Sequence, residues 1–438
     1  MLQNVSTVCL RVTNDCNIKC KYCFVTDKER FVGQRMSFET FKSLIDRLCA
    51  DREKSTIKSK GHVNILFHGG EPTLLGLKEV ERFIRYTKSK FKDACFSMQT
   101  NLTNIDDDWA HLFVQYGMTI GVSLDGIKSR DNVLRKKGYD FVEKLKILKK
   151  HKINFGALMI MTQKSIKRFF YNAMIFHKKY GVNAVRANYV EALEENKFCY
   201  PELTGDELYK GVFLPVMNYF FKKKKIIECH TNELLIRFIN SILFEKIDYK
   251  NNFGSFICGP KFCAGGNSFV AVEPNGDIKM CDRYFGLDEY NIGNVNINKD
   301  LFGITSMQQI LKSQLEWISL LEEKECDMCF AQDTCYYSCI PFVKRKFGKS
   351  IIRENIVCEY HKKVKTYLMN NRYKVIYSYA QMLNKEYQIF EDRNYYIVNI
   401  SPLDNYYRYE YKKKIDRNIE WVKINEKMFL KISKAIFF

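Results

Sequence analysis

The sequence contains no apolar run that approaches the ~18 residues of a membrane-spanning helix. Its first residues, Met-Leu-Gln-Asn-Val, lack the basic stretch and the apolar core of a secretory signal peptide. We therefore expect a cytoplasmic protein with no membrane partner.

Acidic residues are fewer than basic ones: 50 Asp and Glu stand against 70 Lys and Arg, which gives a formal net charge of +20. A basic balance favours acidic partners such as a nucleic acid, an acidic leader peptide or a membrane surface. A Lys-rich, AT-rich genome explains the same numbers, and the charge is spread along the chain rather than gathered in one block. With 46% hydrophobic and 14% aromatic residues, the 438-residue chain can build a sizeable core.

Cysteine is the residue type that stands out, with sixteen in the chain. In a cytosolic protein these thiols stay reduced, so metal ligation explains them better than disulfides do. Three lie at positions 16, 20 and 23, and eight more fall between 258 and 358. The other five are scattered and fit ordinary core packing: Cys9, Cys49, Cys95, Cys199 and Cys229.

Short apolar runs alternate with amphipathic stretches from about residue 7 to 192. The expected strands cover 8–13, 63–68, 95–100, 119–124, 155–161 and 184–190. The expected helices lie between them, near 37–50, 77–91, 106–116, 138–152 and 165–181. This alternation predicts an α/β fold with a parallel sheet. Six such units are fewer than the eight of a closed barrel, so we expect an open, partial (β/α)6 barrel with its ligand site at the C-terminal ends of the strands.

Four segments are expected along the chain. They are a partial barrel at 1–202, a helical bridge at 203–254, a small cysteine-rich domain at 255–372 and a C-terminal extension of unknown role at 373–438. Residues 268–281 predict a β-hairpin, because their Asn-Gly pair is a strong tight-turn signal. The cysteines around this hairpin lie in loops of little periodicity, as expected where metal replaces a hydrophobic core.

The first cysteine group, Cys16, Cys20 and Cys23, follows directly on the first expected strand. Three thiolates within eight residues can wrap one cube of iron and sulfide. Zinc usually takes four ligands, and no fourth is evident nearby. Three protein ligands leave one iron open, and an open iron can chelate a substrate or cofactor.

This group resembles the signature of the radical S-adenosylmethionine (radical SAM) superfamily, which is Cys-x3-Cys-x2-Cys with an aromatic, here Tyr22, before the last cysteine. The resemblance implies that Cys16, Cys20 and Cys23 bind a 4Fe–4S cluster that cleaves S-adenosylmethionine to a 5′-deoxyadenosyl radical. It extends to further residues that would contact S-adenosylmethionine. These are Tyr22 beside the adenine, Gly69, Gly70 and Glu71 in a loop that holds the methionine amino group, and Ser123, Asp125 and Arg135.

The later cysteines can be read in two ways from the residues alone. Eight thiolates can fully ligate two four-iron clusters, and Cys-x2-Cys pairs are also typical of zinc knuckles, so a pair of zinc sites stays open. The run from 326 to 358 has the spacing Cys-x2-Cys-x5-Cys-x3-Cys-x18-Cys. The eight are Cys258, Cys263, Cys281, Cys326, Cys329, Cys335, Cys339 and Cys358.

This region resembles the SPASM domain of radical enzymes that act on peptides and proteins, most closely that of the anaerobic sulfatase-maturating enzymes. The resemblance covers roughly residues 8–370 and implies three 4Fe–4S clusters in all. It assigns Cys258, Cys263, Cys281 and Cys339 to one auxiliary cluster, and Cys326, Cys329, Cys335 and Cys358 to the other.

Two residues bear on the substrate. Asp282 follows Cys281 where the sulfatase-maturating family has an Asp that takes a proton from the substrate; from the residues alone it equally fits a turn cap or a partner for Arg283. His68 stands where that family generally has Gln, and His is common there in enzymes that crosslink ribosomal peptides.

Three functions compete at this point. The first is maturation of a ribosomally made peptide (a RiPP) by hydrogen abstraction, followed by crosslinking or oxidation. The second is an anaerobic sulfatase-maturating enzyme that forms formylglycine from Cys or Ser. Both need a peptide or protein substrate and an external one-electron donor such as flavodoxin or ferredoxin. The third, a zinc-knuckle RNA-binding protein, is disfavoured because it leaves the first half of the chain unexplained.

Overall fold

The computed structural model describes most of the first 300 residues and parts of the remainder. The described residues are 5–23, 25, 33–53, 63–190, 203–243, 258–259, 262–263, 265–266, 268–297, 326–332, 334–335, 355–382, 387–392 and 395–400, with single helical positions at 308, 315 and 319. Cys339 and most of the predicted C-terminal extension lie outside them.

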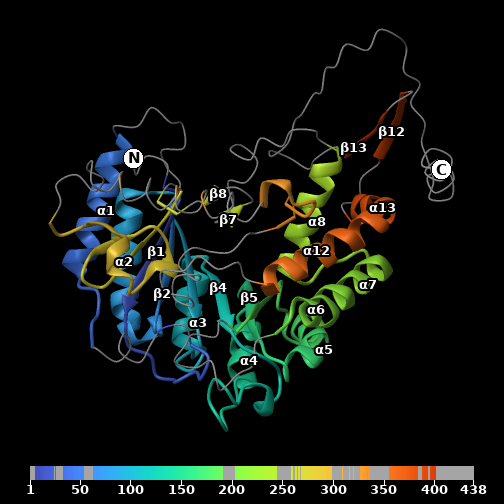
Figure 1. Cartoon of the computed structure of the whole chain (residues 1–438). Helices are drawn as coiled ribbons and strands as arrows, with labels where there is room; N and C mark the ends of the chain where they lie inside the picture. The colour runs from blue at the N-terminus through green and yellow to red at the C-terminus, as the bar shows by residue number, and fades with distance from the viewer. Residues whose placement is uncertain are drawn as a thin grey trace.

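Parallel strands build the first half of the chain, as the sequence predicted (Figure 1). Each pairs with the next in chain order. They are β1 (Thr7–Thr13), β2 (Asn64–Gly69), β3 (Cys95–Thr100), β4 (Thr119–Ser123), β5 (Phe155–Met161) and β6 (Val185–Tyr189). Among the described strands β6 is one edge of the sheet and β11 the other, so the sheet does not close. The predicted open, partial barrel is confirmed.

Helices alternate with these strands and cover the sheet. They are α1 (Phe38–Glu53), α2 (Leu77–Lys90), α3 (Asp107–Gln115), α4 (Val142–Lys150) and α5 (Phe169–Ile175). Helix α2 buries Val80, Phe83, Ile84 and Thr87, the spacing of a single helical face. The Phe83 ring stacks on Phe41 of α1, with ring centroids 4.0 Å apart, so neighbouring helices pack against each other as well as on the sheet.

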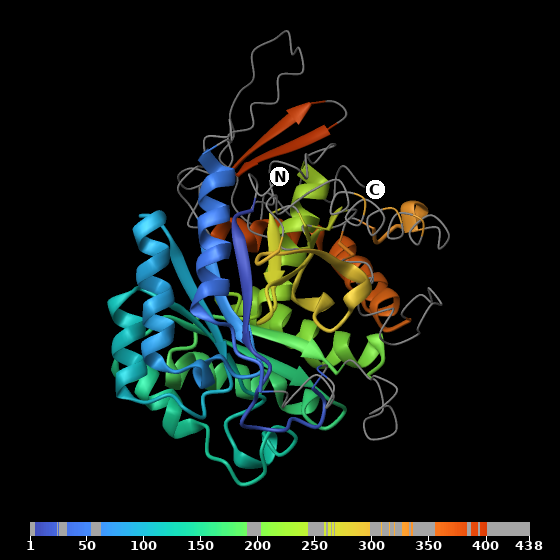
Figure 2. The ribbon, with the colours of Figure 1, turned by 90° about the vertical axis from the view of Figure 1, so that its left-hand side faces the viewer.

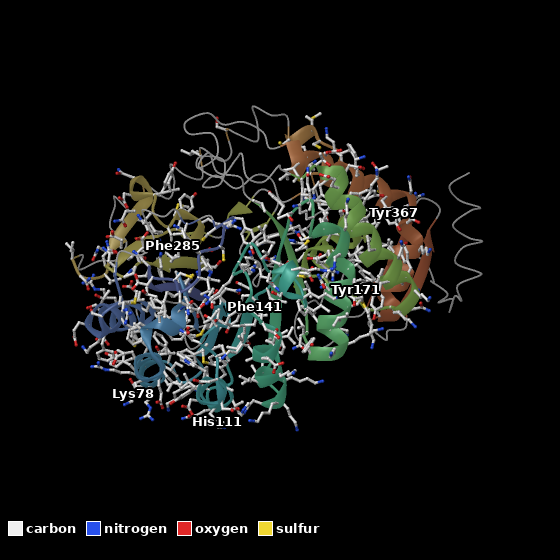
Figure 3. All side chains as sticks on the ribbon, turned by 90° about the horizontal axis from the view of Figure 1, so that it is seen from below. Lys78, His111, Phe141, Tyr171, Phe285 and Tyr367 are labelled. Atoms are coloured by element: carbon white, nitrogen blue, oxygen red, sulfur yellow. The ribbon has the colours of Figure 1, made fainter. Side chains whose placement is uncertain are left out.

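A second group of helices follows the barrel and forms its own hydrophobic core. The segment predicted as a bridge contains α6 (Gly205–Leu208), α7 (Leu214–Lys223) and α8 (Cys229–Leu243). Helices α12 (Asn355–Asn370) and α13 (Arg372–Met382) pack on these. Their shared core includes Phe213, Met217, Phe220, Leu234, Phe238, Val364, Leu368 and Val375. Figure 3 shows Tyr367 among these helices, at the opposite side of the molecule from Phe285.

The cysteine-rich segment continues the barrel sheet. Strands β9 (Phe269–Val272) and β10 (Asp277–Lys279) form the predicted antiparallel hairpin, and β11 (Asn291–Asn294) pairs with β10. Strand β9 also lies parallel to β1, with Thr7 opposite Phe269. Figure 2 shows these yellow strands beside the blue β1. The cysteine-rich segment is therefore joined to the barrel by backbone hydrogen bonds, a pairing that the sequence did not predict.

Shorter strands complete the described fold. Strands β7 (Cys258–Gly259) and β8 (Phe262–Cys263) pair antiparallel, which sets the backbone of Cys258 opposite that of Cys263. Strands β12 (Tyr387–Asp392) and β13 (Tyr395–Ile400) form a separate hairpin. Within the described residues, every helix is too short or too polar to span a membrane.

Glu228 fixes the start of α8 against the edge strand β6. Its buried carboxylate accepts hydrogen bonds from the backbone N–H groups of Ala187 (3.2 Å), His230 (3.1 Å) and Thr231 (2.7 Å). Buried N–H groups that lose their acceptor are costly, so this one side chain joins the first turn of α8 to the edge strand β6.

We expect Glu228→Ala to destabilise the protein by about 2 kcal/mol or more, because a helix cap and three buried bonds are lost together. Thermal unfolding measures this loss. The matched control is Glu233→Ala in the same helix, which removes a half-exposed ion pair with Arg186 (3.0 Å) and should cost less than about 1 kcal/mol. Equal losses in the two variants would contradict the capping role.

Candidate active site

The three cysteines of the first group lie together in the loop after β1. Burial raises the pKa of the Cys20 thiol to about 12, and the nearby Cys23 and Cys16 act in the same direction, while Arg135 opposes them. Burial likewise raises the pKa of Cys16 to about 11. The thiols therefore interact electrostatically across a poorly solvated region. A metal centre would be needed to keep them deprotonated there.

This donor set fits an iron–sulfur cluster. Soft thiolates from one short loop are the usual ligands of such clusters. Within the described residues, no three His, Cys, Asp or Glu side chains converge tightly enough to hold a single metal ion.

The loop after β2 lies directly on the chain that leads to Cys16. The backbone N–H of Gly70 donates to the Thr13 carbonyl (2.9 Å), and that of Glu71 donates to the Asp15 carbonyl (2.8 Å). A Cβ atom at Gly70 would stand 2.1 Å from the Asp15 carbonyl oxygen. Only glycine allows this approach, which explains the residue type at position 70.

The Glu71 side chain is used inside the protein. It is fully buried, and its carboxylate accepts from the Thr73 hydroxyl (2.7 Å), the Thr100 hydroxyl (2.8 Å) and the Asn101 backbone N–H (2.7 Å). Burial raises the Glu71 pKa, although these hydrogen bonds oppose the shift. The observed role of Glu71 is thus to fix the shape of the loop, and a direct contact with S-adenosylmethionine stays a prediction.

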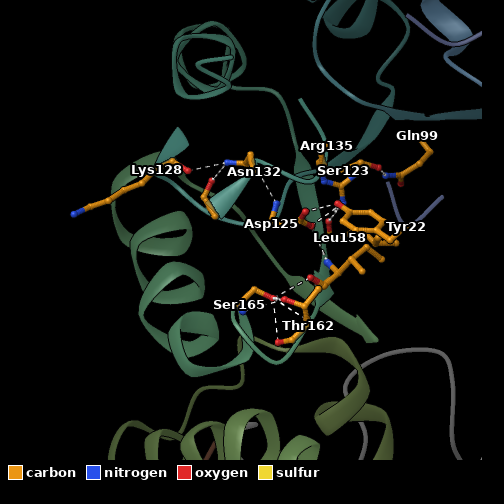
Figure 4. A network of polar contacts seen from close by, with 12 residues as sticks. Tyr22, Gln99, Ser123, Asp125, Lys128, Asn132, Arg135, Leu158, Thr162 and Ser165 are labelled. Atoms are coloured by element: carbon orange, nitrogen blue, oxygen red, sulfur yellow. Dashed lines mark hydrogen bonds and ion pairs between the residues drawn. The ribbon is translucent and has the colours of Figure 1, made fainter. Parts of the chain in front are cut away.

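Tyr22, Asp125 and Arg135 form a buried network (Figure 4). The Tyr22 hydroxyl donates to one oxygen of Asp125. The other oxygen accepts from Arg135 (2.9 Å) and from the Ile160 backbone N–H (2.9 Å). The guanidinium also lies 5.4 Å from the centre of the Tyr22 ring. The sequence named these three residues separately, and the structure brings them together beside Cys20.

The charges in this network support one another. Burial raises the pKa of Tyr22 well above its usual value. Burial alone would lower the pKa of Arg135, but Asp125 and then Tyr22 and Cys20 raise it. The Nε atom of Arg135 is buried and has no hydrogen-bond partner among the described residues. A buried cation with an unused donor next to the cysteine loop suits a site for an anionic group, such as a cofactor carboxylate.

Ser123, at the end of β4, is held by a residue that the sequence analysis missed. Its hydroxyl accepts from Gln99 Nε2 at 2.8 Å. Gln99 in turn fills the space beside Gly121, where a Cβ atom would stand 2.1 Å from Gln99 Oε1. A polar residue within a predicted strand was the available signal for Gln99.

Asp282 and His68 lie near each other, although they are far apart in the sequence. Arg11 of β1 is directly opposite His68 of β2, so both side chains leave the same face of the sheet. Burial lowers the pKa of His68, and Asp282 opposes this shift through its charge, while Arg11 and Arg283 add to it. Asp282 therefore faces the residue that immediately precedes the Gly69-Gly70 loop.

The later cysteines are described in part. Cys281 is buried directly before Asp282, Cys326 and Cys329 lie in one tight turn, and Cys358 lies on α12. Cys335 follows the fully buried Thr334. The division of the later cysteines into two ligand sets stays a prediction.

Comparison with known proteins identifies a protein family for this part of the chain. A family model described as "Radical SAM superfamily" matches residues 10–168. This part of the chain is a radical SAM domain. The matched span contains the cysteine loop, the Gly69-Gly70 loop and the Asp125 network described above. The superfamily implies S-adenosylmethionine and a 4Fe–4S cluster as cofactors.

Proteins similar to this chain include a sulfatase-maturating enzyme and two solved structures with different bound peptides. A cysteine-type anaerobic sulfatase-maturating enzyme of Clostridium novyi is 24% identical over 82% of this chain and 93% of its own length. The structure of native anSMEcpe with bound AdoMet and Cp18Cys peptide matches with a TM-score of 0.66 at 22% identity, over 86% of this chain and 99% of that one. Streptococcus suis SuiB bound to precursor peptide SuiA matches with a TM-score of 0.57 at 15% identity, over 81% and 76%.

The buried ion pair at the centre of the network can be tested without cofactors. Asp125→Ala leaves Arg135 as an uncompensated buried charge, which costs about 3–5 kcal/mol. We expect a strongly lowered unfolding temperature for the metal-free variant. The double variant Asp125→Ala/Arg135→Met should recover part of the loss, because it removes the orphaned charge. Glu81→Ala, which breaks the exposed pair with Arg85 (2.7 Å), should change little. A double variant no more stable than the single one would refute this account.

Proposed function

We propose that this radical SAM enzyme modifies a residue of a ribosomally made precursor peptide, leading to a crosslink or an oxidised side chain. The observation that carries the proposal is the proximity of Asp282 to His68, which leaves the same face of the sheet as Arg11 next to the Gly69-Gly70 loop. His at this position resembles the peptide-crosslinking enzymes rather than the sulfatase-maturating ones. The net charge of +20 suits an acidic leader sequence.

The proposed roles follow from the contacts. Cys16, Cys20 and Cys23 would hold the first cluster, and the Arg135 guanidinium would bind an anionic group of S-adenosylmethionine. When bound, these cofactors supply one-electron reduction of the sulfonium and hydrogen abstraction from an unactivated C–H bond. An external one-electron donor such as flavodoxin or ferredoxin would provide the electron.

Asp282 would accept a proton at a carboxylate oxygen as the substrate side chain is oxidised. His68, held largely neutral by burial, would offer a hydrogen bond to Asp282 or to the substrate rather than a second charge. In the proposed assignment the two auxiliary clusters, one of them next to Asp282 through Cys281, would accept the remaining electron.

A second candidate is sulfatase maturation, in which a Cys or Ser becomes formylglycine. It is favoured by the match over 93% of the length of the Clostridium novyi enzyme and by Asp282 itself. A direct comparison separates the two. Purified enzyme is incubated with a sulfatase-type Cys peptide and with precursor peptides encoded near its own gene, and mass changes of each are measured. Formylglycine in the sulfatase peptide alone would decide for the second candidate.

The number of clusters can be counted. We expect anaerobically reconstituted protein to hold about twelve irons per chain, and Cys16→Ala/Cys20→Ala/Cys23→Ala to hold about eight, as one four-iron cluster plus two more requires. Only the intact protein should cleave S-adenosylmethionine. Four irons with two zincs would keep the radical chemistry and remove the auxiliary clusters. Protein without iron would refute the proposal.

Asp282 can be separated from the cofactor chemistry. We expect Asp282→Asn to keep S-adenosylmethionine cleavage but to lower the rate of peptide product formation about 10²- to 10⁴-fold, the usual contribution of a general base. Asp288→Asn is the matched control, because Asp288 lies on the same segment and is exposed. Unchanged product formation in Asp282→Asn would show that the proton goes elsewhere.

A further inference from the structure

Asn101 lies where the first three strands end and is used by no step described so far. It directly follows β3 and is almost completely buried. Its backbone N–H donates to the Glu71 carboxylate at 2.7 Å. The position of Asn101 is therefore set by the same buried carboxylate that shapes the Gly69-Gly70 loop.

The side-chain amide of Asn101 is oriented by its neighbours. Its Oδ1 accepts from the Thr103 backbone N–H (3.0 Å) and from the Thr103 hydroxyl (2.6 Å). Because a backbone N–H can only donate, the oxygen of the amide must face Thr103. The Nδ2 group then points the other way, where it donates to Asn17 Oδ1 (2.9 Å) and to the Sγ atom of Cys16 (3.7 Å).

Each donor and acceptor of this amide is thus satisfied, and one N–H is committed to a sulfur atom. Hydrogen bonds to cluster sulfurs stabilise negative charge on them, and they are among the features that set the reduction potential of an iron–sulfur cluster. A reduced cluster carries one more electron than an oxidised one, so a donor N–H stabilises the reduced form more.

We propose that Asn101 is a positioning residue whose side-chain N–H, donated to Cys16, makes the first cluster easier to reduce. This inference rests on the proposed role of Cys16 as a ligand of that cluster. The redox step is a one-electron transfer from an external low-potential donor, with no bond made or broken in Asn101. Through its bond to Glu71, the same residue ties the cysteine loop to the loop that would hold the methionine part of S-adenosylmethionine.

The test is a potentiometric titration of the full-length reconstituted protein, followed by electron paramagnetic resonance, with dithionite as the reductant. The signal that changes when S-adenosylmethionine is added reports the first cluster apart from the others. We expect Asn101→Ala to lower the equilibrium constant for its reduction up to about tenfold, the effect of one hydrogen bond, which is a shift of up to about 59 mV to more negative potential for one electron. Asn101→Asp, equal in size but negatively charged, should shift it further.

Asn104→Ala is the matched control, because Asn104 bonds to Asn17 and Thr73 in the same loop without touching Cys16. It should leave the potential unchanged. Wild-type potential in both Asn101 variants would overturn the inference. So would loss of the first cluster's iron from both variants while Asn104→Ala keeps it, since Asn101 would then serve assembly alone.

The outcomes also separate this inference from the proposed function. If wild-type protein shows no signal that responds to S-adenosylmethionine, or if the signal survives Cys16→Ala, the assignment of the cluster fails. If the signal behaves as expected and only the Asn101 variants leave its potential unchanged, the cluster assignment stands and the role of Asn101 fails.

Discussion

The backbone contact between the loop at Gly70 and the chain at Asp15 is the constraint on which the site depends. No side chain fits between them, since a Cβ atom at Gly70 would lie 2.1 Å from the Asp15 carbonyl oxygen. The contact fixes how far the loop predicted to hold S-adenosylmethionine stands from the loop that carries Cys16. Two backbones hydrogen-bonded to each other keep this distance fixed without relying on mobile side chains.

Buried carboxylates next to this contact fix the segments around it. The Glu71 carboxylate, just after β2, accepts hydrogen bonds from the end of β3. The Asp125 carboxylate accepts from Tyr22, from Arg135 and from the backbone of β5. Such groups are costly to bury unless each oxygen finds a donor, and here the carboxylate oxygens do. The large apolar core on β1 to β6 offsets that cost. The apolar core of the sheet and helices thus supplies most of the stability, while the buried polar groups at the strand ends fix the conformation of the loops there.

Local features of the sequence predicted most of the barrel. Strands β3 and β5 have the predicted bounds, because short apolar runs flanked by polar segments are a local signal. The pairing of β9 with β1 was not predicted, since it joins segments that no local pattern relates. Asn101 was missed for a related reason: an Asn after a strand is typical of a turn, and its contact with Cys16 exists only in three dimensions.

Solved structures of similar fold hold different peptides, Cp18Cys in one and precursor peptide SuiA in another, so the fold alone does not identify the substrate of this chain. Near Asp282, burial lowers the pKa of His68; the charge of Asp282 opposes this shift, and Arg11 and Arg283 add to it. A neutral His and a Gln can each both donate and accept hydrogen bonds, but the rigid ring of His places its donor and acceptor at different points from those of the Gln amide. Exchange of Gln for His would therefore keep this face of the sheet polar while moving its hydrogen-bonding atoms.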